Sequence, residues 1–238
     1  MSQKQPAIMA WSGGKDSAFC LYKVLKEGRF GVRYLLTTLN SDFRRISMHG
    51  VREELLDRQA ASVGIPLLKV WVAEGTNEEY ERQMEAVLLK ARSEGIRHVI
   101  FGDIFLEDLR AYREQNLAKA GMEAVFPLWG SDTGRLSREF TGSGFRTVVC
   151  CTNDAFLGEE WLGREVDGKF IRELPSNVDP CGENGEYHTF CFDGPVFRTP
   201  IGFSAGDKVF RPLEGGPYTV GSAGDAPATR GFWYQELV

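Results

Sequence analysis

The chain has 238 residues, of which 42% are hydrophobic and 26% are charged, and this balance excludes a largely disordered chain. Its 33 acidic and 28 basic residues leave a formal charge of −5, which disfavours RNA or DNA as the dominant partner. No segment has the roughly 18 consecutive apolar residues that span a membrane, and the five cysteines form no CxxC motif, so we expect a reduced protein in the cytoplasm.

Short apolar segments alternate with helical patterns through the first half of the chain. Strands are predicted at residues 7–11, 32–39, 67–72, 98–101 and 124–127. Helical spacing of apolar residues follows at 18–25, 49–63, 80–91 and 106–120, and a glycine ends each stretch. Alternating strands and helices imply an α/β fold, a parallel sheet covered on both faces. Such sheets bind ligands beyond the carboxyl ends of the strands.

The pattern changes in the second half of the chain. Strands are predicted at residues 147–151 and 187–192. Gly and Pro supply eleven of the forty residues from 199 to 238, which indicates turns and short strands. We therefore predict two domains, an α/β domain at 1–128 and a smaller α+β domain at 129–238.

Residues 12–17, Ser-Gly-Gly-Lys-Asp-Ser, lie between the first predicted strand and the first predicted helix. Gly13 and Gly14 let the backbone approach an anion, and the following helix start offers free N–H groups and a positive dipole end. Ser12 and Ser17 add hydroxyl donors, and Lys15 adds a charge, so the segment predicts binding of an oligophosphate. The Walker A spacing and the GxGxxG motif are both absent. The alternative is a simple glycine turn before a capped helix.

A second dense motif, Cys-Gly-Glu-Asn-Gly-Glu-Tyr-His-Thr, occupies residues 181–189. Asn184-Gly185 is a strong signal for a tight turn. Glu183 and Glu186 flank this turn, and in an extended strand Glu186 and His188 share one face. A carboxylate or an imidazole can accept a proton, and a carboxylate can also hold an ammonium ion. The alternative is a surface hairpin with solvated glutamates.

The loop at 12–17 resembles the PP-loop of ATP pyrophosphatases, which cleave ATP to AMP and pyrophosphate. This resemblance implies a five-stranded parallel sheet of the HUP/PP-loop type, with strand order 3-2-1-4-5. That order would place Gly102 and Asp103, at the end of the fourth strand, beside the loop. The chain as a whole resembles the short form of the diphthine–ammonia ligase family. The motifs that carry this resemblance are SGGKDS (12–17), MHGVR (48–52), FGDI (101–104), FPLW (126–129), GENGEYHT (182–189) and FDGP (192–195).

The resemblance implies an AMP-forming amide ligase. An acceptor carboxylate would attack the α-phosphate of ATP to form an acyl-adenylate, and ammonia would then displace AMP. The implied ATP-binding residues are Ser12, Gly13, Gly14, Lys15, Asp16, Ser17, His49, Gly102 and Asp103. The implied catalytic residues are Glu183, Glu186 and His188, and Asn184, Gly185 and Thr189 would contact the substrate. His49 could instead be an ordinary histidine at a helix start.

Further expectations concern a metal ion, two arginines and the molecules that the protein binds. Mg²⁺ is expected to bridge the phosphates with few protein ligands, and Asp103 is a candidate ligand. Arg110 and Arg113 follow on a helix, where solvated charges are the default, but Arg110 could bind a phosphate or the acceptor carboxylate in a forked geometry. The expected partners are ATP, ammonia or ammonium, and a carboxylate on a small molecule or a protein side chain. A homodimer is compatible with the sequence.

Two other functions are alternatives to an amide ligase. PP-loop enzymes that thiolate RNA usually need a cysteine pair or a persulfide carrier and a basic RNA-binding surface, and the sequence has neither signal. A non-catalytic, ATP-binding regulator would not need the motif at 182–189. Both alternatives are therefore weaker than an amide ligase.

Overall fold

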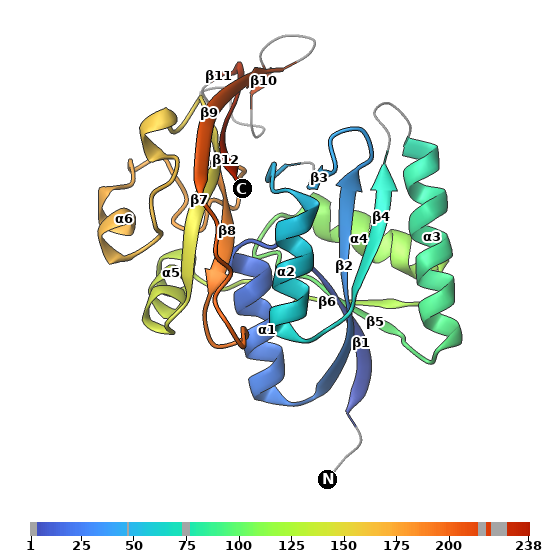
Figure 1. The fold of residues 1–238 in the computed structure, drawn as a ribbon. Helices are drawn as coiled ribbons and strands as arrows, with labels where there is room; N and C mark the ends of the chain where they lie inside the picture. The colour runs from blue at the N-terminus through green and yellow to red at the C-terminus, as the bar shows by residue number, and fades with distance from the viewer. Residues whose placement is uncertain (1–3, 47, 73–76, 214–217, 220–227) are drawn as a thin grey trace.

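The computed structural model describes residues 4–46, 48–72, 77–213, 218–219 and 228–238. Within this part of the chain, one large sheet is built from the first half and a second sheet from the second half (Figure 1). Helices α1 (Lys15–Glu27) and α2 (Glu53–Val63) lie between the two sheets. No described helix is long and apolar enough to cross a membrane, and the cytoplasmic location stays a prediction.

The first sheet has the predicted strand order. Its parallel strands are β4 (Leu67–Val72), β2 (Phe30–Asn40), β1 (Gln5–Ala10), β5 (His98–Ile100) and β6 (Glu123–Val125), in that spatial order. In chain order these are strands 3-2-1-4-5, so the expected fold class is confirmed. A short strand, β3 (Arg45–Ile46), pairs antiparallel with the end of β2. The order reverses between β1 and β5, and this is where open parallel sheets bind ligands.

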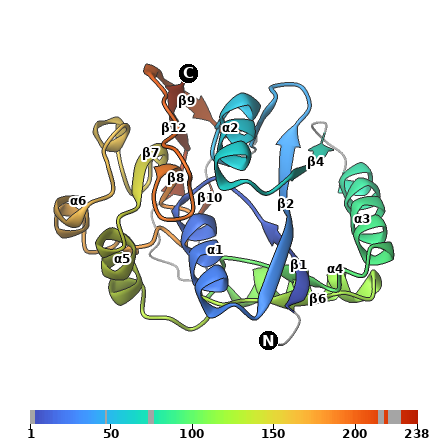
Figure 2. The ribbon, with the colours of Figure 1, turned by 60° about the horizontal axis from the view of Figure 1, so that its bottom comes forward.

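Helices cover both faces of this sheet. Helices α1 and α2 lie on one face, and α3 (Asn77–Ser93) and α4 (Glu107–Lys119) lie on the other (Figures 1 and 2). Right-handed crossovers require this division. The chain adds β2 and β4 on one side of β1 and then crosses back to add β5 and β6 on the other side, so the helices of the two stretches lie on opposite faces. Gly28 ends α1 in a left-handed conformation, with φ of 75°, and its N–H donates to the Val24 carbonyl. Such a conformation is typical of glycine after a helix.

The predicted start of the second helix was wrong. The sequence pattern placed it at residue 49, but α2 begins at Glu53. The preceding residues turn back on β3 instead: the Gly50 N–H donates to the Ile46 carbonyl, and Arg45 and Arg52 form an isolated β-bridge. Gly50 has φ of 67°, which a helix does not allow. His49 is therefore carried on a loop rather than on a helix.

The second half forms a smaller antiparallel sheet with short helices. Its strands, in spatial order, are β8 (Tyr187–Asp193), β7 (Arg146–Asn153), β12 (Gly231–Leu237) and β9 (Ala205–Pro212). The helical segments are α5 (Thr133–Gly142), the 3-10 turn η1 (Glu159–Trp161) and α6 (Gly168–Glu173), and β10 (Tyr218–Thr219) pairs with β11 (Ala228–Thr229). The predicted strands at 147–151 and 187–192 are β7 and β8.

One hydrophobic core joins the two halves. It contains Trp11 and Leu21 from the first half and Phe145 and Phe190 from the second, all 5% exposed or less. Burial of such side chains stabilises a contact by roughly 1.5–3 kcal/mol each. Figure 2 shows α1 next to β8. The shared core therefore holds α1 against β8, the strand that contains the last three residues of the second motif.

Candidate active site

The loop between β1 and α1 is clamped by α2 and β8. The carbonyl of Gly13 accepts hydrogen bonds from the Cys191 N–H at 2.8 Å and from Gln59 Nε2 at 2.9 Å. A Cβ on Gly13 would lie 2.7 Å from Gln59 Oε1, and a Cβ on Gly14 would lie 2.9 Å from His49 Cε1. Neither position has room for a side chain. The glycines therefore permit close packing of β8 and of His49 on the loop.

The second motif contacts the start of α1 directly. The hydroxyl of Thr189 accepts a hydrogen bond from the Lys15 N–H at 3.0 Å. The Thr189 carbonyl lies 3.1 Å from His49 Nδ1. The Lys15 ammonium donates to the carbonyl of Cys181 and, at 2.7 Å, to the carboxylate of Asp16. The structure thus brings together the loop, His49 and both ends of the second motif.

Lys15 is buried and charged. Burial alone would lower the pKa of its ammonium, but the Asp16 carboxylate together with Tyr187 and Cys181 outweighs this, and the pKa lies above its usual range. The Tyr187 ring lies 5.6 Å from the ammonium and adds a cation–π contact. The side chain of Lys15 thus holds the second motif against the loop.

Gly102 and Asp103 lie beside the start of α1, as the strand order implied. A Cβ on Gly102 would lie 3.1 Å from the carbonyl of Asp16 and 3.3 Å from the amide nitrogen of Ser17. The Asp103 carboxylate pairs with Arg113, with 2.7 Å between Oδ2 and Nε. Gly102 therefore packs directly on the backbone at the start of α1, where the first N–H groups of a helix have no partner within it.

Glu183 reaches from the second motif to the end of β5. Its Oε1 accepts a hydrogen bond from the Ile104 N–H at 2.6 Å. Burial raises the pKa of Glu183 to about 7, with a further contribution from the nearby Asp16 carboxylate. A carboxyl group that titrates near neutral pH can act as a proton acceptor under physiological conditions.

Glu186 instead holds the turn in shape. It is 1% exposed, and its Oε1 accepts from the Asp179 N–H at 2.9 Å and from Asn184 Nδ2 at 3.1 Å. Gly185, with φ of 81°, lies in the turn between Asn184 and Glu186. Among the described residues, the second carboxylate oxygen of Glu186 is buried without a hydrogen-bond partner. Glu186 thus connects Asp179 to Asn184 within the turn.

The rings of His49 and His188 lie close together in this site. Their ring centroids are 4.6 Å apart, with the planes tilted by 32°. Burial lowers the pKa of His49 to about 4 and the pKa of His188 well below its usual range. Both imidazoles are therefore neutral at pH 7. In the described part of the chain, Nε2 of His188 is buried without a hydrogen-bond partner.

Arg110 and Arg113 have different surroundings. The guanidinium of Arg110 stacks on Trp129, 4.7 Å from the ring centroid, and pairs with Glu114 at 2.8 Å. Arg113 contacts Asp103 and also lies 4.4 Å from the centroid of the Phe101 ring. The sequence pattern favours Arg110 as the anion-binding residue and predicts a solvated charge at Arg113. Arg113 lies one helical turn before the buried Leu117, and this spacing could have indicated a position facing the sheet.

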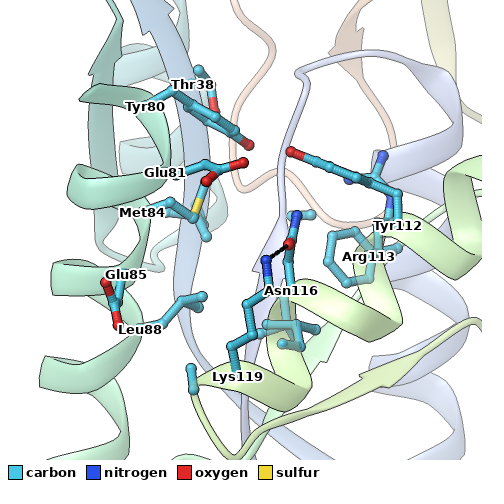
Figure 3. Close-up of a pocket in the computed structure, with 16 residues that line it drawn as sticks. Thr38, Tyr80, Glu81, Met84, Glu85, Leu88, Tyr112, Arg113, Asn116 and Lys119 are labelled. Carbon is cyan, nitrogen blue, oxygen red and sulfur yellow. Dashed lines mark hydrogen bonds between the residues drawn. The ribbon is translucent and has the colours of Figure 1, made fainter. Parts of the chain in front are cut away.

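A cavity of about 210 Å³ lies between α3, α4 and the sheet, next to the loop (Figure 3). Ala10 and Phe101 line it. Ala10 is the last residue of β1, two residues before the loop begins at Ser12, and Phe101 directly precedes Gly102. Tyr80 from α3 and Tyr112 from α4 face each other across its mouth (Figure 3). Apolar and aromatic walls with a few polar groups are typical of small-molecule sites. The sequence pattern does not predict this cavity, because its walls come from segments far apart in the chain.

Comparisons with known proteins agree with the motifs. Two family models match: the diphthamide synthase N-terminal domain at residues 5–124 and the diphthamide synthase C-terminal domain at residues 132–218. The diphthine–ammonia ligase of Mus musculus is 25% identical, over 85% of this chain and 84% of that protein. The human protein of the same name is 26% identical, over 80% and 79%. The Saccharomyces cerevisiae protein is 22% identical, and this chain covers only 33% of its length.

Proposed function

Because the chain belongs to the diphthamide synthase family, we propose that it is an ATP-dependent ligase that joins ammonia to a carboxylate. The similar proteins are named diphthine–ammonia ligases, which supports both the ligase class and ammonia as a substrate. The observation that carries the proposal is the contact of the second motif with the phosphate loop, through Thr189 and Lys15. In this proposal, residues 1–128 bind ATP and residues 129–238 bind the acceptor molecule.

The phosphates of ATP would lie at the start of α1. Ser12, Ser17 and the amides of Asp16 and Ser17 are the donors in reach, and the helix dipole favours negative charge there. Gly102 lets the end of β5 pack closely beside this helix start, because any side chain there would meet the backbone of Asp16. The nucleoside would occupy the cavity between α3 and α4, where Phe101 offers an aromatic wall.

Mg²⁺ fits this arrangement when ATP supplies most of its ligands. Mg²⁺ is usually bound through one or two carboxylates together with phosphates and waters. Among the described residues there is no cluster of three or more His, Cys, Asp or Glu that could hold a metal alone. Oδ2 of Asp103 is buried and makes no well-aligned hydrogen bond, although Arg113 is close. Asp103 would therefore be the protein ligand, and the ion would neutralise phosphate charge.

The proposed reaction has two steps. The acceptor carboxylate attacks the α-phosphate, which releases pyrophosphate and forms an acyl-adenylate. Ammonia then attacks the acyl carbon and AMP leaves. Ammonium must lose a proton before it can attack, and Glu183, with a pKa of about 7, is the proton acceptor that we propose. The neutral rings of His49 and His188 would bind the adenylate by hydrogen bonds, since imidazoles with such low pKa values are weak bases.

Product analysis tests the proposed function. The purified chain would be incubated with α-labelled ATP, Mg²⁺, ammonium and a panel of carboxylate acceptors that includes a protein carrying diphthine. AMP and pyrophosphate that form only with both an acceptor and ammonium support the ligase. ADP as the main product excludes it, and ATP binding with no turnover on any acceptor favours the regulator. Glu183→Gln is the matched control, because it keeps the shape of the side chain and removes the proton acceptor.

A further inference from the structure

A second cavity, of about 230 Å³, lies where the loop after β2 meets strands β9 and β12. We call it the seam cavity. Its main lining residues are Asn40 at the end of β2, Phe43 from the following loop, Arg45 from β3, Arg211 from β9, and Tyr234 and Glu236 from β12. Gly50 also lines it, and a Cβ there would lie 2.6 Å from the Tyr234 ring. The next residue back, His49, contacts Thr189, so the seam cavity adjoins the candidate active site.

The seam cavity has an excess of positive charge. Two guanidinium groups, of Arg45 and Arg211, line it against one carboxylate, that of Glu236. Glu236 is already shared, because it lies 2.8 Å from Arg45 and 3.1 Å from Arg52. In the part of the chain that the structure describes, Arg211 has no carboxylate partner. An anionic guest would balance this charge.

The geometry of Arg211 suits a carboxylate. Its guanidinium lies over two rings, 5.4 Å from the centroid of Phe43 and 5.5 Å from that of Tyr234. Stacking occupies the faces of a guanidinium and leaves its N–H edges free for a forked pair of hydrogen bonds. Phe43 is 50% exposed, so one of these rings is open to contact with an apolar part of a guest.

We propose that the seam cavity binds a carboxylate of the acceptor molecule, distinct from the carboxylate that is amidated. This inference rests on the proposed ligase function for the identity of the guest as an acceptor. Arg211 holds the carboxylate, and Phe43 and Tyr234 flank the adjoining apolar part. Arg45 donates to the Gly50 carbonyl at 2.8 Å and so links the cavity to the loop that carries His49. The preferred acceptor then has at least two carboxylates, or one carboxylate besides its reactive group.

Binding of succinate, a simple dicarboxylate, tests the proposal. Backbone amide NMR spectra of the full chain would be followed during titration with sodium succinate, sodium phosphate or sodium chloride at constant ionic strength. We expect saturable shifts at Gly50 and Tyr234 with succinate alone. Arg211→Gln should weaken succinate binding about tenfold or more, since a hydrogen-bonded charge pair contributes about 1.5–3 kcal/mol. Arg211→Lys keeps the charge, loses the fork and should also weaken binding.

Arg135→Gln is the matched control, because Arg135 is an exposed residue of α5 that pairs only on the surface with Glu139. It should leave succinate binding unchanged. Equal affinity in Arg211→Gln, shifts reproduced by chloride, or tighter binding of phosphate than of succinate would overturn the carboxylate assignment. The titration contains no ATP. A chain that binds succinate but makes no AMP would defeat only the ligase proposal, and AMP formation without succinate binding would defeat only the seam cavity proposal.

Discussion

The hydroxyl of Thr189 accepts a hydrogen bond from the N–H of Lys15 at 3.0 Å, across 174 residues of sequence. One of the free N–H groups at the start of α1 is thus satisfied by a side chain of the second sheet. Gly14, the residue before the helix, has no side chain to do this. The loop at residues 12–17 and the second motif are therefore joined by this hydrogen bond, and a change in either should alter the other.

The first prediction concerns this hydrogen bond. Thr189→Val keeps the shape of the side chain and removes the acceptor, which leaves the buried Lys15 N–H unsatisfied. The free energy of unfolding should fall by about 1–3 kcal/mol, as measured by urea denaturation. Thr189→Ser keeps the hydroxyl and should retain most of that stability. Equal stability of the Val variant and the original protein would show that the contact contributes nothing.

The second prediction concerns the ion pair between the buried Lys15 ammonium and the Asp16 carboxylate, whose side chain is 33% exposed. Lys15→Met leaves the Asp16 carboxylate without its cation, and because water still reaches Asp16, the free energy of unfolding should fall by less than the about 3–5 kcal/mol of a fully buried pair. The double variant Lys15→Met/Asp16→Asn removes both charges and should recover much of this loss in the same denaturation experiment. A double variant that is no more stable than the single one would mean that the charge of Asp16 is not the cause.

The histidine pair gives a prediction on pH. The folded pKa of His49, about 4, lies below its ordinary value of 6.5, so the unfolded chain binds more protons between these two pH values. The contribution of His49 to stability is therefore present above pH 6.5 and is lost as the pH falls from 6.5 towards 4. NMR titration of the His49 ring should show a neutral imidazole at pH 5.5. A protonated ring at that pH in the folded protein would contradict the assignment.

The short, buried strands were the part of the fold that the sequence predicted best. The third predicted strand has the same bounds as β4, because an apolar run lies there between residues that favour turns. The order of the strands could not be derived in this way, since an apolar run does not specify its neighbour. It came from the resemblance of residues 12–17 to the PP-loop. The start of α2 was missed because Gly50 and the β3 pairing, which the local pattern does not reveal, interrupt the helix.

The candidate site was predictable only in part, for a similar reason. Residues 12–17 and 181–189 are continuous motifs and could be recognised. The contact of Arg113 with Asp103 and the walls of the cavity between α3 and α4 depend on side chains that meet only in the folded chain. The partner of the Lys15 ammonium is a backbone carbonyl, that of Cys181, and no residue type marks such an acceptor. The sequence could name chemical groups but not their pairings.

The last prediction separates the two glutamates of the second motif. Glu183 has a pKa raised to about 7 by burial, whereas Glu186 is fixed by hydrogen bonds from Asp179 and Asn184. Glu183→Gln should keep ATP binding and lower ammonia-dependent turnover by about 10²–10⁴-fold, the usual contribution of a general base. Glu186→Gln keeps an oxygen that can accept both hydrogen bonds, so its turnover should stay within about tenfold of the original, well short of a general-base loss.

The pH dependence of the same variants completes this test. Turnover should rise with pH through about 7 as Glu183 loses its proton. Stability should move in the opposite direction: between pH 4.5 and about 7 the folded chain holds the Glu183 proton more tightly than the unfolded chain, so the free energy of unfolding falls as the pH rises. Glu183→Gln should lose both dependences, and Glu186→Gln should keep them. If Glu186→Gln abolished turnover while Glu183→Gln remained active, Glu186 and not Glu183 would be the proton acceptor.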